Sequence, residues 1–155
     1  GEMKPAAAHK TYLVSRYQLP TPRLSLGGAL GGHASASIDV SDGLIADAGH
    51  IAEQSSVAID IQAEKIPLSE AAAAWLAKAE DADAAYASLA TFGDDYEILF
   101  TAPSSRRRSI EMASQVTKTA VARIGVVHKG KGVRLLNAEG APIKLDAGGF
   151  DHFER

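Results

Sequence analysis

The chain has 155 residues, 46% of them apolar and 23% charged, so it suits one globular domain and is neither disordered nor fibrous. It contains no cysteine, which excludes a disulfide framework, a thiolate metal site and a cysteine nucleophile. A net charge of −3 gives no sign of nucleic-acid or anionic-membrane binding, and no segment is apolar enough to span a bilayer. We therefore expect a soluble, cytoplasmic protein.

Periodicity and turn residues predict helices and strands that alternate along much of the chain. The expected helices cover residues 6–17, 44–54, 69–78, 81–89 and 106–116. The expected strands cover residues 36–40, 57–61, 96–102 and 120–127, and residues 133–137 and 142–145 are typical of a hairpin. Glycines between residues 27 and 32 predict a flexible or tightly turned stretch. The pattern favours an α/β (α+β) fold in which helices are layered on a mixed β-sheet, as a single domain over residues 1–155.

The first candidate site lies where an expected strand leads into a helix, within Ile38-Asp39-Val40-Ser41-Asp42-Gly43-Leu44. Asp39 and Ser41 point to the same side of the strand end, and Asp42 follows in the turn. Helix N-termini suit phosphate, and carboxylates at such a place suit Mg²⁺. Alternatively, Ser41 or Asp42 caps the helix and Asp39 lies in solvent. The helical period places Asp47 on the outward face.

A second candidate is Phe92-Gly93-Asp94-Asp95-Tyr96-Glu97-Ile98, which gathers three carboxylates within four residues at the start of a strand. Neighbouring carboxylates repel unless a cation or a donor offsets them. Its alternative is a polar turn that enters the strand. A third candidate, Gly148-Gly149-Phe150-Asp151-His152-Phe153, could place an aromatic ring over a planar ligand. Its alternative is a terminal turn anchored by Phe150 and Phe153.

Taken together and in order, these strings resemble the C-terminal half of thiamine-monophosphate kinase, a family related to aminoimidazole ribonucleotide synthetase. The matching strings cover nearly the whole chain and are Pro22-Arg23-Leu24, Ile38 to Leu44, Asp47 to Ile51, Gly93 to Glu97 and Gly149 to Phe153. The resemblance implies the fold of the aminoimidazole ribonucleotide synthetase C-terminal domain. It also implies that the family's N-terminal ATP-binding and dimerisation domain is absent from this chain. The chain departs from the family at Phe92, where glycine is usual, and at Phe150, where tyrosine is frequent.

The resemblance implies that the intact protein is a homodimeric kinase that uses ATP and Mg²⁺ to convert thiamine monophosphate to thiamine diphosphate by direct in-line transfer. It implies that Asp39 and Asp42 bind Mg²⁺, that Ser41 contacts ATP and that Asp94 and Phe150 contact the thiamine substrate. It assigns no residue a catalytic role of its own, and this chain alone would have little or no activity. Two alternatives remain open: a non-catalytic ligand-binding domain of the same fold, and a related ATP-dependent synthetase.

Overall fold

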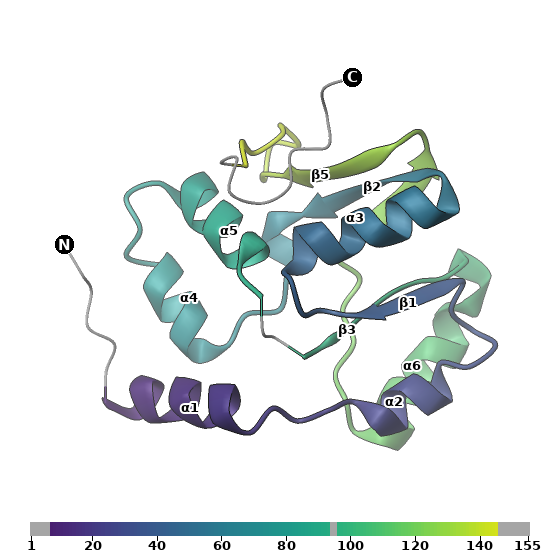
Figure 1. Ribbon diagram of the computed structural model, residues 1–155, viewed down its shortest axis with the longest axis horizontal. Coiled ribbons are helices and arrows are strands. Elements are labelled where there is room, and N and C mark those ends of the chain that lie inside the picture. Colours follow the sequence, from purple (N-terminus) through teal and green to yellow (C-terminus); the bar gives the residue numbers. More distant parts are fainter. Residues whose placement is uncertain (1–6, 94–95, 146–155) are drawn as a thin grey trace.

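The computed structural model describes residues 7–93 and 96–145, which fold as helices packed on two small sheets (Figure 1). The helices are α1 (Ala7–Gln18), α2 (Leu24–Ala29), α3 (Leu44–Ser55), α4 (Glu70–Leu76), α5 (Ala82–Thr91) and α6 (Arg107–Thr117), with short 3₁₀ turns η1 (Ala63–Lys65) and η2 (Ser104–Arg106). The strands are β1 (Ala36–Asp39), β2 (Val57–Gln62), β3 (Ile98–Thr101), β4 (Gly125–Lys129) and β5 (Gly132–Leu136). The α/β class is confirmed.

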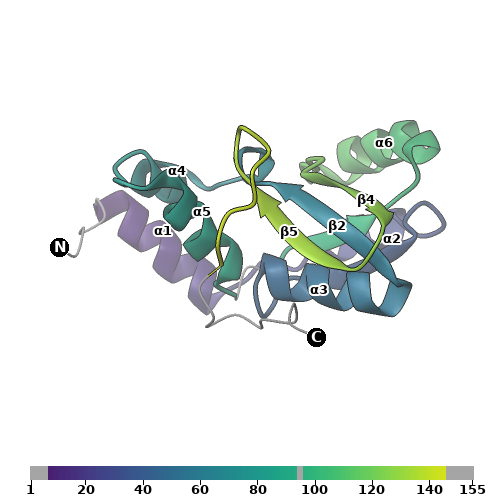
Figure 2. The ribbon, with the colours of Figure 1, turned by 90° about the horizontal axis from the view of Figure 1, so that it is seen from above.

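The described strands pair as two sheets, whereas the sequence pattern predicts one. β1 and β3 form an antiparallel pair in which Asp39 lies opposite Ile98. The other sheet has the order β4-β2-β5, with β4 antiparallel and β5 parallel to the central strand (Figure 2). This second sheet is mixed, as expected. Its two outer strands follow one another in the chain but each pairs with β2 and not with the other, so residues 125–136 do not form a local hairpin.

Three local expectations are wrong. Part of the glycine-rich stretch is helical, because α2 packs on α6 through Leu26, Leu30 and Ala113, which offsets the poor helix propensity of glycine. The strand expected over residues 120–127 begins at Gly125 instead. Of the hairpin expected over residues 133–137 and 142–145, one bridge between Leu136 and Pro142 forms, flanked by hydrogen bonds from the Asn137 N–H to the Ala141 carbonyl at 2.9 Å and from the Ile143 N–H to the Leu135 carbonyl at 2.8 Å, and no strand follows it.

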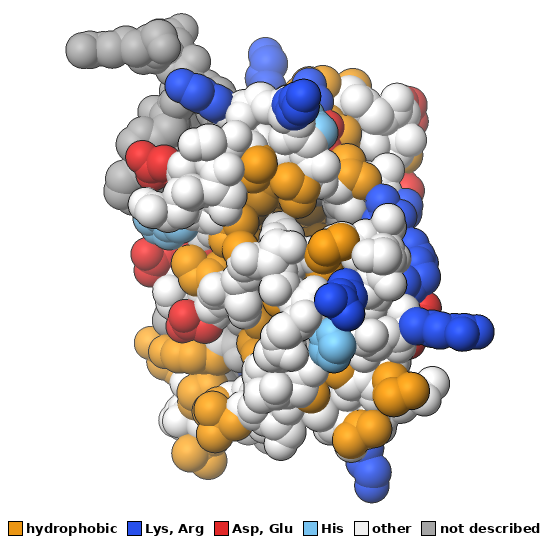
Figure 3. Space-filling model, turned by 90° about the vertical axis from the view of Figure 1, so that its right-hand side faces the viewer, with side chains coloured by type: hydrophobic (Ala, Val, Ile, Leu, Met, Phe, Trp, Pro, Cys, Tyr) orange, Lys and Arg blue, Asp and Glu red, His pale blue; other side chains and the backbone are white. Residues whose placement is uncertain are grey.

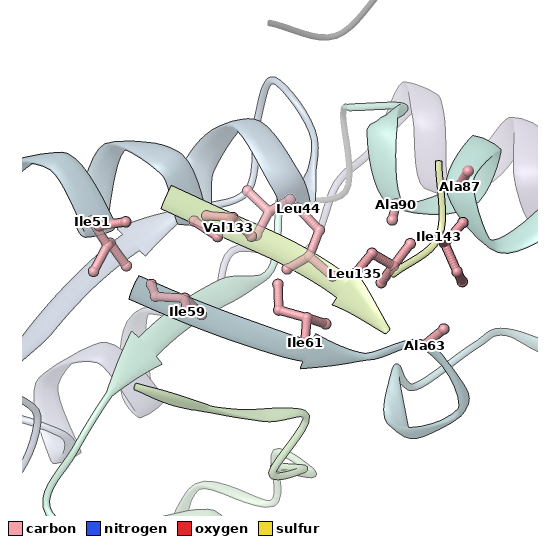
Figure 4. Packing of buried hydrophobic residues seen from close by; sticks show 13 residues of the cluster. Leu44, Ile51, Ile59, Ile61, Ala63, Ala87, Ala90, Val133, Leu135 and Ile143 are labelled. Carbon is pink, nitrogen blue, oxygen red and sulfur yellow. The ribbon is translucent and has the colours of Figure 1, made fainter. Parts of the chain in front are cut away.

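Helix α3 lies between the two sheets and organises the main core (Figure 1). The close-up in Figure 4 shows its apolar side chains facing those of β2 and β5, with contributions from α5. The labelled side chains are Leu44, Ile51, Ile59, Ile61, Ala63, Ala87, Ala90, Val133, Leu135 and Ile143. Each buried Leu or Ile contributes roughly 1.5–3 kcal/mol of transfer free energy. This packing fixes the place at which α3 begins.

The small β1-β3 sheet is covered on both of its faces. Ile38 of β1 and Leu99 of β3 pack with the main core, while Ile98 and Phe100 of β3 pack against the cluster of α2 and α6. The three consecutive apolar residues of β3, Ile98 to Phe100, thus pack on both faces of the strand. The end of β1 and the start of β3 are therefore held between helices.

Hydrophobic side chains also reach the surface at the end of the molecule where α2 and α6 lie (Figure 3). Leu24 of α2 and Met112 and Val116 of α6 are among the exposed ones. Within the described ranges, no helix has the length and apolar character needed to cross a membrane.

Candidate functional site

The two acidic segments singled out from the sequence lie against one another at the end of β1. Beyond the strand pairing, the Val40 N–H donates to the Glu97 carbonyl at 2.8 Å, and the Tyr96 N–H donates to the Val40 carbonyl at 3.0 Å. A Cβ on Gly93 would lie only 2.1 Å from the Ser41 carbonyl oxygen, so this contact is open only to glycine. The fold thus brings the turn after β1 into direct contact with the segment before β3.

Gly43 meets the same neighbouring segment from the other side. Its φ of +116° is unfavourable for other residues, and a Cβ there would lie 2.6 Å from the Thr91 carbonyl oxygen. Gly43 is the N-cap residue of α3, and no side chain from the described part of the chain caps this helix end. The interpretation of Ser41 or Asp42 as the helix cap is therefore wrong, because the close approach to Thr91 requires glycine at the cap position.

Asp47 is buried, with 2% of its surface exposed, and its expected outward position is wrong. Its Oδ2 atom accepts hydrogen bonds from the backbone N–H groups of Ser41 at 2.9 Å and Asp42 at 3.1 Å. A carboxylate can stay buried when such donors replace water, and the first turn of a helix further favours negative charge. A signal was present, since an acidic residue near a helix start can reach back to preceding N–H groups.

The hydrogen bonds of Asp47 change what this helix start can bind. We expected free N–H groups here to suit phosphate, but those of Ser41 and Asp42 already face the Asp47 carboxylate. A phosphate group at this turn can therefore use the N–H groups of the first turn of α3, which these two hydrogen bonds do not involve, together with the Ser41 hydroxyl and cations held by nearby carboxylates.

The carboxylates near this turn fall into a single exposed one and a cluster. Asp39 ends β1 with an exposed side chain. Asp42, Asp47 and His50 each offer one ligand atom, all lying within 4.8 Å of one another, and Asp39 is not part of that group. The exposed carboxylates of Asp39 and Asp42 fit Mg²⁺, which takes one or two protein carboxylates and completes its shell with water and phosphate oxygens. An imidazole such as that of His50 suits transition metals better.

Glu97 links the segment before β3 to the N-terminal helices. Arg23 donates two hydrogen bonds to the Glu97 carboxylate, from Nε at 2.9 Å and from a terminal nitrogen at 2.7 Å. A terminal nitrogen of Arg16, in α1, lies 3.3 Å from the same carboxylate. Hydrogen bonding to Glu97 raises the pKa of Arg23 above its usual value. Tyr96, the preceding residue, has a φ of +53°, a left-handed conformation that is strained for a bulky side chain.

The structure thus unites part of the expected site. Asp39, Ser41 and Asp42 lie at one turn, beside Gly93 and Tyr96 of the second acidic segment. Asp94, Phe150 and the rest of the segment from Gly148 to Phe153 lie outside the described residues. Asp47, which the sequence reasoning missed, lies beneath the turn.

Comparison with known proteins was made by sequence and by structure. No family model matches the chain. The thiamine-monophosphate kinase of Caulobacter vibrioides is 38% identical over 121 residues, which cover 78% of this chain and 34% of that protein. The thiamine-monophosphate kinase of Salmonella typhimurium is 35% identical over 143 residues, which cover 92% of this chain and 42% of that protein.

Solved structures give the same result. A thiamine-monophosphate kinase from Stenotrophomonas maltophilia superposes with a TM-score of 0.76 at 36% identity, over 90% of this chain and 42% of that one. A structure described as AaThiL complexed with AMPPCP and TMP has a TM-score of 0.68 at 33% identity, over 92% of this chain and 41% of that one. The hydrogenase maturation protein HypE of Escherichia coli, at 19% identity and a TM-score of 0.63, shares the fold alone.

The fold and its neighbours define a domain of the aminoimidazole ribonucleotide synthetase-like class. Within that class, the chain is similar in sequence, over most of its own length, to part of the thiamine-monophosphate kinases. It spans about two fifths of the length of the curated relatives that it matches.

Proposed function

We propose that this chain is the C-terminal part of a kinase that transfers the γ-phosphoryl group of ATP to thiamine monophosphate. The observation that carries the proposal is the contact of Gly93 with the Ser41 carbonyl, because it joins the expected metal and nucleotide residues to the expected substrate segment. The names of the relatives support the same reaction, as does the neighbour described with AMPPCP and TMP. An N-terminal domain would complete the site.

Each residue of the proposed site binds or orients a substrate. Asp39 and Asp42 hold Mg²⁺, and Ser41 contacts the nucleotide. When bound, Mg²⁺ supplies positive charge that offsets the repulsion between two phosphate-bearing substrates. Asp94 and Phe150 contact the thiamine substrate, whose cationic thiazolium ring suits a carboxylate and an aromatic face. Transfer is direct and in line, with no covalent enzyme intermediate, so the side chains contribute positioning and charge.

The remaining parts of the proposal concern the intact protein. It would be a homodimer located in the cytoplasm, and the single domain over residues 1–155 would show little activity alone. A direct test is to incubate this chain with γ-labelled ATP, Mg²⁺ and thiamine monophosphate, and to do the same with the full-length protein that its reading frame encodes. We expect labelled thiamine diphosphate from the intact protein only. Robust turnover by the isolated chain would refute the claim that it carries part of a site.

The metal role of Asp39 gives a sharper test in the intact protein. Asp39→Asn keeps the shape of an exposed side chain at the end of β1 but removes its charge. We expect the rate of thiamine diphosphate formation to fall by at least about 100-fold, with unchanged thermal stability. Glu53→Gln, the same change at an exposed position near the far end of α3, is the matched control and should keep wild-type activity.

The proposal fails if Asp39→Asn turns over at the wild-type rate in saturating Mg²⁺. It fails differently if the intact protein binds ATP and thiamine monophosphate in calorimetric titrations without forming product, which is the behaviour of a ligand-binding domain. Formation of another product from ATP would instead identify a synthetase.

A further inference from the structure

Asp47 is a carboxylate in a position where the core would favour an apolar side chain. Among the residues of the described ranges 7–93 and 96–145, Asp47 is the one polar or charged residue that is buried. Its neighbour Ala48 is completely buried, and Leu44, one turn earlier on α3, belongs to the main core. Burying a charge costs free energy unless donors compensate it, so such a residue implies a purpose other than packing.

The donors identify that purpose. They are the N–H groups of Ser41 and Asp42, which lie before the helix and both point to Oδ2. The Asp47 N–H in turn donates to the Gly43 carbonyl at 3.0 Å. The Asp47 side chain therefore holds two consecutive residues of the turn, while its N–H makes the ordinary first backbone bond of the helix. The turn has little apolar anchoring of its own, since Ser41 is half-buried and Asp42 is exposed.

Asp47 could instead act as a direct metal ligand, because it lies in the group with Asp42 and His50. Two observations oppose this role for Mg²⁺. Its Oδ2 atom already accepts two hydrogen bonds. Its side chain is buried, whereas Mg²⁺ usually keeps several waters in its coordination shell. The contacts therefore favour an action through the backbone.

We infer that Asp47 is a positioning residue: it holds the Ser41–Asp42 turn in the shape that directs these two side chains toward the substrates. The nucleotide and metal roles of Ser41 and Asp42 rest on the proposed function. The hydrogen-bonded turn itself does not, and it can be measured without any ligand.

The first measurement is amide hydrogen exchange by NMR on the metal-free chain. We compare wild type with Asp47→Asn, which keeps the side-chain shape, and with Asp47→Ala, which removes the acceptor. Asp81→Ala is the control, because Asp81 also accepts an N–H at a helix start, from Ala84 at 3.0 Å, but belongs to α5. We expect exchange at Ser41 and Asp42 to accelerate at least about tenfold in Asp47→Ala and less in Asp47→Asn, whose amide oxygen is a weaker acceptor.

The second measurement uses the intact kinase and its response to Mg²⁺. We expect the Mg²⁺ concentration for half-maximal rate to rise at least about tenfold in Asp47→Asn. The KM for thiamine monophosphate should change less than about twofold, which separates a displaced turn from general loss of structure. Asp81→Ala should leave both values unchanged.

Each outcome decides the matter. Faster exchange at Ser41 and Asp42 together with the raised Mg²⁺ requirement supports the inference, and Asp47→Asn suffices if Asp47→Ala does not fold. Wild-type exchange in Asp47→Asn overturns it, and if the Mg²⁺ response is nevertheless lost, Asp47 is a direct ligand. If the intact wild type transfers no phosphate, the proposed function fails, while the exchange rates still decide whether Asp47 holds the turn.

Discussion

Two aspartates show how differently two regions of the molecule use a carboxylate. Asp47, at the start of α3, accepts hydrogen bonds from backbone N–H groups of the preceding turn. Asp60, in the middle of β2, is bound by side chains of both neighbouring strands. Arg134 of β5 donates to it at 2.8 and 2.7 Å, and the His128 ring of β4 lies 3.1 Å away.

The difference lies in what each region must keep fixed. Around Asp47, the backbone approaches itself so closely that Gly43 and Gly93 leave no room for a Cβ. Around Asp60, a Cβ on Gly125 would likewise lie 2.1 Å from the Asp60 carbonyl oxygen, but this close approach belongs to the pairing of β4 with β2, and the side chains add links between strands that their ladders already pair. Strict backbone geometry that apolar packing does not require is typical of a functional site, whereas side-chain pairs on a sheet contribute modest stability.

The largest expected effect comes from a substitution at Gly93, where the backbone around Asp47 approaches itself closely. In Gly93→Ala the new Cβ would lie 2.1 Å from the Ser41 carbonyl oxygen, so the backbone of one segment must move. We expect a loss of about 2–4 kcal/mol in the free energy of unfolding, together with a loss of kinase activity in the intact protein. Urea unfolding of the chain measures the first effect, and the transfer assay measures the second.

Gly49→Ala is the matched control for this change. Gly49 lies within α3, and a Cβ there would meet nothing within 4 Å. Because alanine favours helix, this variant should gain roughly 0.5–1 kcal/mol. Equal stability of the Gly93 and Gly49 variants would contradict the requirement for glycine at position 93.

The candidate site could be predicted from the sequence only where its signals are local. The change from strand to helical periodicity and Gly43 locate the turn that carries Asp39 and Asp42. Helical periodicity alone assigns Asp47 to the solvent face, and the one local signal against this is its place near a helix start, from which an acidic residue can reach back to preceding N–H groups. Its donors become visible only when the turn has a defined shape.

The fold shows the same limit. The elements with regular periodicity, such as α3 and β2, were predicted nearly in place. The parallel pairing of β2 with β5 joins segments far apart in the chain, and no local pattern specifies it. The helix α2 depends on contacts with α6, which override the preference of its glycines. The missed features are therefore those that tertiary contacts decide.

A smaller effect is expected when the charge of Asp60 is removed. The hydrogen bonds from Arg134 hold the pKa of the Asp60 carboxyl below its usual value, against the opposing effect of partial burial. A lowered folded pKa stabilises the protein above the ordinary carboxyl pKa of about 3.9, and this stabilisation is lost as the pH falls through the lowered value. Asp60→Asn should therefore lower the melting temperature by about 2–4 °C at pH 6.

The pH dependence of the stability difference tests whether the charge of Asp60 is its source. The difference between Asp60→Asn and wild type should shrink below about pH 4, where the wild-type carboxyl also becomes neutral. Arg134→Gln should remove most of the same pH dependence, because it takes away the main cause of the lowered pKa. A difference that stays constant from pH 6 to the lowest pH at which both proteins are folded would show that charge is not its source.

The smallest effect is expected for the ion pair between Arg23 and Glu97, which lies beside the closely approaching backbone around Asp47. Glu97 has 44% of its side chain exposed, so solvent screens its two hydrogen bonds from Arg23. Arg23→Gln should cost less than about 1 kcal/mol, and less still in 1 M salt. Arg16→Gln, which removes a single contact at 3.3 Å, should cost less than Arg23→Gln. If Arg23→Gln were instead as damaging as Gly93→Ala, side-chain pairing rather than close backbone contact would hold the segment before β3 in place.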